Sequence, residues 1–293
     1  MADDPWVGTV LAKRYRIESP YYRTTKAELY RGLDLGTQAQ VVVHLANGEF
    51  SQNSQFTSQF EQDARRLRTL EHPAIIPVLE HGRERDRLFM VCPFLPGGSL
   101  EQQIRRQWSV ERTNEVVERI GEALAYLHGQ ELVHLNVSAD SILFDEESRP
   151  HLSLGFGRIG RAIDPAAGRG NVYVLPEQAR LNYVLADPKV DVYAFGVVLW
   201  LMLLGQPPYL DTPLDKQLIE SGQKVELPDS WRAILERAIS SNPERRFNSM
   251  PEFLAAWRQT QDQAHPSFWQ RAQQKAQEGR NAAAQYLYGS KTQ

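Results

Sequence analysis

The sequence predicts an α+β protein with two unequal lobes, a small β-rich lobe followed by a larger helical one. Short segments that alternate in hydrophobicity between turns fill the first part of the chain. From Ser99 onward, apolar residues recur with a helical period instead. The break Pro96-Gly97-Gly98 separates the two patterns. We expect an N-terminal extension over 1–14, the β-rich lobe over 15–95, the helical lobe over 96–258 and a tail over 259–293.

The first lobe is predicted to contain strands and one long helix. Strand-forming residues alternate with polar ones between turns, of which Asp34-Leu35-Gly36 is one. The predicted strands are Tyr15–Ile17, Ala27–Gly32, Gln40–Leu45, Ile75–Glu80 and Leu88–Phe94. Apolar residues at every third or fourth position predict a helix over Ser54–Leu70, which ends before His72-Pro73.

The second lobe is predicted to be helical around one irregular centre. The predicted helices are Ser99–Arg106, Val110–His128, Val190–Leu204, Leu214–Ser221, Ser230–Ser240 and Met250–Gln261. Val190–Leu204 is apolar on almost every side, which predicts a helix buried within the lobe. At the centre, Leu132–Ile159 is predicted to form short apolar strands at 132–134, 141–144 and 151–154 around a polar loop and a turn.

The composition narrows the class of protein. A net charge of −3 offers no global field for nucleic acid. The single cysteine, Cys92, cannot form an internal disulfide and fits a reducing compartment. The longest apolar run, Val197–Leu204, is far short of the ~20 residues that a membrane-spanning helix needs. The N-terminus shows no basic segment followed by an apolar run, so we expect no signal peptide. We expect a cytoplasmic protein without a transmembrane segment and without a nucleic-acid partner.

Five short motifs in the chain resemble, in order and at similar spacing, those of the bacterial-type serine/threonine protein kinase family. They are Glu71–Pro77, Pro96–Leu100, Leu175–Glu177, Asp191–Gly196 and Asn242–Phe247. The resemblance covers the chain from about Tyr15 to Trp257 and implies a bilobal protein kinase-like fold. It also implies structural roles for four residues. Glu177 and Arg246 would form a buried ion pair, and Asp191 at a helix start would accept backbone N–H bonds from the loop around His134. His134 itself would pack in the column of side chains that links the lobes.

The resemblance also shows where the chain departs from the family. The stretch that matches the glycine-rich phosphate loop, residues 19–27, has no glycine and carries Tyr21 and Tyr22. The lysine that binds the α- and β-phosphates is replaced by His44, and its partner glutamate by Asp63. A contact between His44 and Asp63 and two unrelated polar side chains are equally compatible with the sequence.

The catalytic positions of the second lobe are changed as well. The base maps to Asn136, and the metal ligands map to Ser141 and to Leu154, or Ser153 if one residue was deleted in the turn. Asp140 and Asp145 lie nearby, but we expect the first to point away from the cleft and the second to serve a turn. The former nucleotide pocket would be lined by Tyr21, Tyr22, Val42, Cys92 and Leu143. We expect no metal and no cofactor.

These departures predict a pseudokinase, a member of the family that does not act as an enzyme and instead regulates or scaffolds another protein. The alternative is an atypical nucleotide-using enzyme, or a nucleotide-binding switch, on the same fold. The partner would dock on the activation segment Arg158–Leu175 or on the tail, where aromatic residues can anchor an interface. The tail candidates are Phe268, Trp269, Tyr286 and Tyr288. The other interpretation of the tail is a solvated helix.

Overall fold

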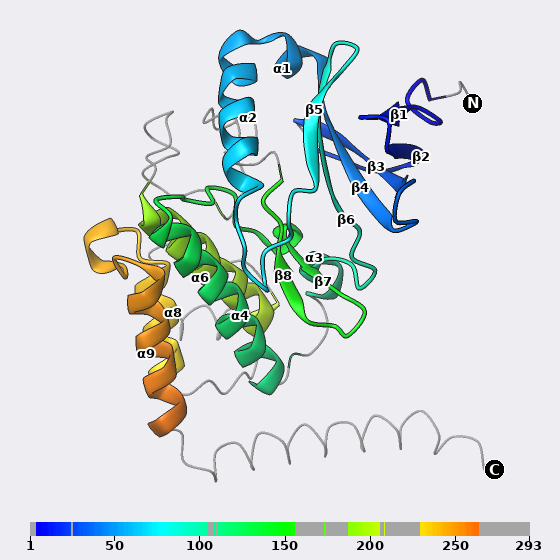
Figure 1. Ribbon diagram of the computed structural model, residues 1–293. Helices are drawn as coiled ribbons and strands as arrows, with labels where there is room; N and C mark the ends of the chain where they lie inside the picture. Colours follow the sequence, from blue (N-terminus) through cyan, green and yellow to red (C-terminus); the bar gives the residue numbers. More distant parts are fainter. Residues whose placement is uncertain are drawn as a thin grey trace, which may run out of the picture.

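The computed structural model describes residues 4–24, 26–104, 108, 110–155, 173, 187–205, 208 and 229–263. Within them, a twisted antiparallel sheet and helix α2 make up one lobe, and helices make up most of the other (Figure 1). The sheet has the strand order β1-β2-β3-β4-β6-β5. Its strands are β1 (Val10–Leu11), β2 (Tyr15–Arg23), β3 (Ala27–Asp34), β4 (Gln40–Ala46), β5 (Glu80–Glu84) and β6 (Arg87–Pro93).

The two faces of the sheet follow from alternation along its strands. In β4, Val41, Val43 and Leu45 belong to a core on the outer face, which also includes Trp6 from the N-terminal segment. Ala46 follows Leu45 and points to the opposite face, where it belongs to the main core. Successive side chains of a strand point to opposite faces, so Val42 and His44 share the inner face with Ala46. This inner face is the one that turns toward α2 and the second lobe.

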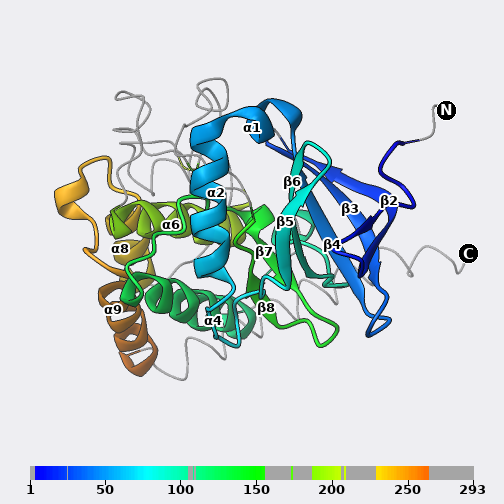
Figure 2. The ribbon, with the colours of Figure 1, turned by 45° about the horizontal axis from the view of Figure 1, so that its top comes forward.

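Helix α2 (Ser54–Leu67) covers the inner face of the sheet (Figure 2). The Asn53 side chain caps its N-terminus by accepting a hydrogen bond from the Phe56 N–H. Phe56, Phe60 and Leu67 recur at helical spacing and pack into the main core. The short helix α1 (Gly48–Gln52) leads into α2.

The second lobe is built around α6 (Pro188–Leu204), which is buried along almost its whole length. Asp187 caps it at the N-terminus and Gly205, with φ of 67°, ends it. Around it lie α4 (Val110–Gly129), α8 (Asp229–Ala238) and α9 (Met250–Gln263). The remaining described elements are α3 (Leu100–Gln103), the 3₁₀ turns η1 (Ala139–Ser141) and η2 (Pro243–Arg245), and the hairpin strands β7 (Ile142–Phe144) and β8 (Pro150–Leu152). None of the helices described is both long and apolar enough to cross a bilayer.

The hairpin β7–β8 joins the lobes. The backbone N–H of Ile76 donates to the Leu152 carbonyl at 2.9 Å, and the Leu152 N–H donates to Ala74 at 2.8 Å. On the other side of the hairpin, the Phe144 N–H donates to Gly98 in the connection between the lobes at 2.9 Å. The hairpin is therefore bonded both to the segment that follows α2 and to the connection between the lobes.

The predicted α+β class and bilobal architecture are confirmed, with local corrections. The predicted strand Ile75–Glu80 is wrong, because Ile75 makes only an isolated bridge with Leu152 and β5 begins at Glu80. That apolar run reflects burial between the two lobes. The predicted strand at 132–134 is also absent, and β1 and α1 were not predicted. The predicted helix Leu214–Ser221 lies outside the described residues.

Candidate functional site

The candidate site is the space between the inner face of the sheet and the hairpin β7–β8. His44 stands on β4 above this space, opposite Met90 of β6 in the strand register. The side chain is buried, and burial lowers the pKa of its imidazole to about 4. His44 is therefore neutral at pH 7 and cannot provide the positive charge that a lysine provides at such a position.

Asp63 lies on the buried face of α2, in the same helical stripe as Phe60 and Leu67. Its residue surface is only 7% exposed. Burial is the cause of the lowered pKa of His44, and Asp63 has no hydrogen bond or ion pair with the described residues. Of the two interpretations left open by the sequence, the structure gives no support to a His44–Asp63 pair.

Three apolar side chains line the part of the site next to the connection between the lobes. Val42 and Cys92 are register partners on β4 and β6 and are both buried. Burial raises the pKa of the Cys92 thiol to about 12, so the thiol stays protonated. Leu143 of β7 is partly buried and packs against the main core, to which Cys92 belongs. That these three residues line a former nucleotide pocket stays a prediction.

The outer end of this apolar region carries an aromatic and cationic group that the sequence analysis missed. The Arg31 guanidinium lies 4.1 Å from the centre of the Phe94 ring. Tyr21 meets Phe94 edge-to-face at 5.9 Å, and its own side chain is 43% exposed. Tyr21 therefore contacts the connection between the lobes and remains partly open to solvent.

Tyr22 is an exposed residue of β2 on which Asp140 of the other lobe acts electrostatically. The negative charge of Asp140 is the largest cause of the raised pKa of the Tyr22 hydroxyl, followed by burial. Tyr173 lies on the same side, where its hydroxyl accepts a hydrogen bond from the Ala139 N–H at 3.3 Å. The charge of Asp140 therefore acts on a tyrosine of the opposite lobe, while the expected direction of its side chain stays a prediction.

The loop beneath the site is held by Asp191 at the start of α6. Its fully buried carboxylate accepts the backbone N–H groups of His134 at 2.7 Å and Leu135 at 2.8 Å. His128 Nε2 lies 2.9 Å from the same carboxylate. Leu135 adopts a left-handed backbone with φ of 64°, a conformation that costs energy for a residue with a side chain. The bonds to Asp191 hold the loop in this shape.

His134 links this loop to Ser153, the residue that follows β8. The Asn136 N–H donates to His134 Nδ1 at 3.2 Å, so the hydrogen of the neutral ring is on Nε2. His134 Nε2 then donates to the Ser153 carbonyl at 2.9 Å. The side chain is buried, and both ring nitrogens are used in fixing the backbone. This is a structural arrangement in which His134 has no atom left for a ligand.

The three residues at the expected base and metal positions differ in their surroundings. Asn136 is exposed. The Ser141 hydroxyl is spent locally, since it donates to the Ser138 carbonyl at 2.8 Å and accepts from the Ser138 N–H at 2.9 Å. Leu154 is buried in the main core. An amide, a committed hydroxyl and a buried alkyl group cannot gather magnesium as carboxylates do.

Asp145 is also committed to its own turn. Its carboxylate accepts from the Arg149 N–H at 2.7 Å, from Arg149 Nε at 2.8 Å and from His151 Nε2 at 2.9 Å. Although partial burial acts in the opposite direction, these hydrogen bonds hold the pKa of Asp145 well below its usual range. Among the described residues, no group of three or more His, Cys, Asp and Glu side chains is arranged to hold a metal ion.

Several predicted residues lie elsewhere or outside the described part of the chain. Arg246 is buried, donates from Nε to the Ser240 carbonyl at 2.7 Å and stands 4.9 Å from the centre of the Tyr193 ring. Its expected partner Glu177 lies outside the described residues. The same holds for the tail candidates Phe268, Trp269, Tyr286 and Tyr288, and for the activation segment except Tyr173.

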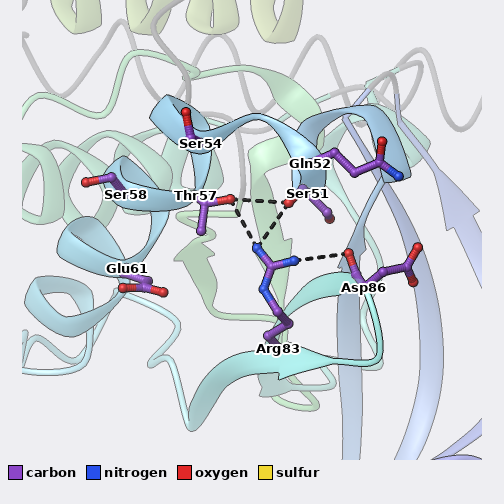
Figure 3. A pocket seen from close by; sticks show the side chains of 8 residues that line it. All are labelled: Ser51, Gln52, Ser54, Thr57, Ser58, Glu61, Arg83 and Asp86. Carbon is purple, nitrogen blue, oxygen red and sulfur yellow. Dashed lines mark hydrogen bonds between the residues drawn. The ribbon is translucent and has the colours of Figure 1, made fainter.

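Two surface pockets lie away from this site. One, of about 520 Å³, is polar and opens between the α1–α2 pair and the β5–β6 hairpin (Figure 3). In it, Arg83 Nη2 donates to the Ser51 carbonyl at 3.0 Å and to Thr57 Oγ1 at 3.1 Å, which ties the hairpin to both helices. The other, of about 390 Å³, lies behind the connection between the lobes and has Ile76, Pro93 and His151 in its wall.

Comparison with known proteins gives consistent matches. A family model described as protein tyrosine and serine/threonine kinase matches residues 23–258. The serine/threonine-protein kinase PknA of Mycobacterium tuberculosis is 28% identical, with 86% of this chain and 62% of that protein covered. The serine/threonine-protein kinase pkn3 of Myxococcus xanthus is 26% identical, with coverage of 86% and 51%. The chain thus spans between 51% and 62% of the length of these two relatives.

The fold match is equally broad. The crystal structure of the Mycobacterium tuberculosis PknI kinase domain superposes with a TM-score of 0.66 at 20% sequence identity, covering 86% of this chain and 98% of that one. The relatives are named as protein kinases, and the matching family model is that of kinases. These findings contradict the expectation that the protein is not an enzyme, and that expectation is withdrawn.

Proposed function

This chain belongs to the protein tyrosine and serine/threonine kinase family, and we propose that its main role within that family is regulatory, through binding of another protein. Magnesium-dependent phosphoryl transfer by the usual route is, in this proposal, slow. The observation that carries the proposal is the buried, neutral His44 on β4, whose pKa of about 4 leaves the site without a cation there. Phosphoryl transfer depends chiefly on such positioned charges.

Three further features support a slow reaction. Asn136 cannot accept a proton as a base does, and the loss of general base catalysis typically costs ~10²–10⁴ in rate. Ser141 is committed to Ser138, and Leu154 is buried in the core, so neither supplies a magnesium ligand. The pseudokinase interpretation therefore means that phosphoryl transfer by this protein is slow.

The first experiment measures phosphoryl transfer from labelled ATP with Mg²⁺ or Mn²⁺. The unaltered chain is compared with a restored variant that combines His44→Lys, Asn136→Asp, Ser141→Asn and Leu154→Asp. We expect the restored variant to be faster by at least about 10²-fold, the lower bound for the return of a general base. Val7→Ala, a change at a 44% exposed side chain, serves as the control. Equal rates in the unaltered and restored proteins would contradict the proposal.

The second candidate is a nucleotide-binding switch. It is supported by the burial of Val42 and Cys92 and the partial burial of Leu143, which would give an apolar wall at the positions that the resemblance assigns to the nucleotide pocket. A thermal shift with ATP measures this directly, because a ligand that binds the native state raises its apparent stability. No shift at millimolar ATP would remove this candidate.

The partner is proposed to be a protein, bound through the tail or the activation segment, in the bacterial cytoplasm. The single buried thiol supports a reducing compartment. The lobe boundaries 15–95 and 96–258 and the tail 259–293 are part of the same proposal. Affinity capture with the full chain should lose its specific partner when Phe268→Ala and Trp269→Ala are combined. The matched tail variant Gln273→Ala should still capture the partner. Equal capture by the double variant and by Gln273→Ala would exclude the tail as the docking site.

A further inference from the structure

The polar pocket between the α1–α2 pair and the β5–β6 hairpin has no task in the proposed function. Its volume of about 520 Å³ lies within the range of about 300–1,000 Å³ that is typical of small-molecule sites. Both helices and the hairpin contribute side chains to its wall (Figure 3). Every described residue of that wall is polar or charged. Recognition in this pocket therefore depends on hydrogen bonds and charge.

Arg83 of the hairpin is a fixed group in this wall. Its Nη2 donates to the Ser51 carbonyl at 3.0 Å and to Thr57 Oγ1 at 3.1 Å. Its Nη1 donates to the Asp86 carbonyl at 3.2 Å. All three acceptors are uncharged oxygens, and Arg83 makes no ion pair with the described residues. A guanidinium has five N–H donors, so two of them are left for a ligand.

The other side chains of the wall add both donors and acceptors. Ser54 and Ser58 are exposed on α2, and neither hydroxyl has a partner in the part of the chain that the structure describes. Glu61 and Asp86 contribute carboxylates, of which that of Glu61 stands 3.7 Å from the Arg65 guanidinium. The pocket therefore offers N–H and O–H donors together with strong oxygen acceptors.

This mixture selects against ligands with a net charge. An anion would be repelled by Glu61 and Asp86, and a cation would be repelled by Arg83. Carboxylates accept hydrogen bonds without donating them, and ammonium groups donate without accepting. A hydroxyl does both. Several hydroxyl groups on an uncharged molecule can therefore serve the donors and the acceptors of the wall at the same time.

We infer that this pocket binds a neutral polyhydroxylated molecule through Arg83, Ser54 and Ser58. An open-chain polyol and a ring sugar share this chemistry and are the two sources of such a ligand. Because Arg83 already ties the hairpin to α1 and α2, a ligand bonded to it would brace α2 against the sheet. This site goes beyond the proposed regulatory role and does not depend on it, since its test measures binding and not phosphoryl transfer or partner capture.

The experiment is a titration of the isotope-labelled full chain, followed by NMR at the Arg83 Nε–H and the Gln52 side-chain amide. The neutral probes are D-sorbitol and D-glucose. D-gluconate and D-glucosamine are the matched probes, with a similar set of hydroxyls and an added negative or positive charge. Thermal shift is not suitable, because polyols stabilise folded proteins in general by exclusion from their surfaces. We expect saturable changes with a neutral probe. A response to sorbitol alone identifies an open-chain polyol, and a response to glucose alone identifies a ring sugar.

The binding variant combines Ser54→Ala and Ser58→Ala, which leave the fold intact because both side chains are exposed. Loss of two hydrogen bonds should raise the Kd of the neutral probe by at least about fivefold. Gln62→Ala is the control, an exposed position of α2 outside the wall, and its Kd should be unchanged. The proposed site is overturned if the double variant binds as tightly as Gln62→Ala. It is overturned as well if only gluconate or only glucosamine gives saturable changes, or if no probe does.

Discussion

Replacing Asp191 by alanine should be among the most destabilising single changes in the second lobe. Its carboxylate is fully buried and serves the His134 N–H, the Leu135 N–H and His128 Nε2. Without it, these donors are left in a dry environment with no acceptor. Each unsatisfied buried donor costs about 1–3 kcal/mol, and breaking a buried charged cluster by removing one partner costs about 3–5 kcal/mol in total.

We therefore expect Asp191→Ala to lower the free energy of unfolding by roughly 3–5 kcal/mol. At 2–4 °C per kcal/mol for domains of about 150–250 residues, the loss in Tm is roughly 6–20 °C. Asp191→Asn keeps one acceptor oxygen, so its Tm should lie between those of the unaltered protein and Asp191→Ala. Thermal and urea denaturation followed by circular dichroism measure both variants.

The matched control is Asp187→Ala, four residues earlier at the N-cap of the same helix. Asp187 accepts one hydrogen bond, from the Lys189 N–H at 2.8 Å, and its loss should cost about 1 kcal/mol. Amide hydrogen exchange at Leu135 gives a local measurement, because its left-handed backbone is held by Asp191. The reasoning is refuted if Asp191→Ala is no more destabilising than Asp187→Ala, or if exchange at Leu135 is unchanged.

Three further predictions concern other parts of the molecule. The pKa of His44 is about 4 in the folded protein and about 6.5 in the unfolded chain. Between pH 6.5 and pH 4 the unfolded chain therefore binds more protons than the folded one. The free energy of unfolding should fall by about 3 kcal/mol as pH drops through this window. His44→Gln should flatten that slope in urea titrations, and an unchanged slope would contradict the burial of a neutral imidazole. The hydrogen bonds that depress the pKa of Asp145 stabilise the fold above about pH 4, and this stabilisation is lost as pH falls further. Asp145→Asn should therefore be less stable at neutral pH but less sensitive to acid. Parallel acid denaturation curves for the two proteins would disprove this. Trp6 is buried on the outer face of the sheet beside Arg85. Trp6→Ala should lower the free energy of unfolding by roughly 3–5 kcal/mol, whereas Val7→Ala, at an exposed side chain, should change it by no more than about 0.5 kcal/mol. Equal effects of the two variants on urea denaturation would show that the N-terminal segment does not contribute to the core.

Local sequence patterns predicted most of the elements, because each depends on neighbours a few residues away. The helical spacing of Phe56, Phe60 and Leu67 predicted α2 to within a turn, and the apolar sequence of Val190–Leu204 predicted a buried α6. Local patterns predicted the wrong element where residues are buried by a distant part of the chain. Ile75 and Ile76 resemble a strand because both lobes enclose them, and their backbone pairs with β8 at single points only.

The candidate site shows the same division. Residue types at 44, 63, 136, 141 and 154 could be compared with the family motifs from the sequence, and they indicated a changed phosphate and metal site. The contact of Arg31 with Phe94 and Tyr21 could not be predicted, because it joins β2, β3 and the connection after β6 at the edge of the sheet. The effect of Asp140 on Tyr22 crosses from one lobe to the other, which no local pattern records.

The sequence by itself determined the class of fold, the order of the lobes and the chemical groups present at each position of the site. Only the tertiary structure decided which of those groups have partners. Ser141 and Asp145 are satisfied by neighbours in their own turns, whereas Asp63 has no hydrogen bond or ion pair with the described residues. The physical reason is that the free energy of a polar group depends on burial and on the donors around it, and both are set by residues brought together from distant parts of the chain.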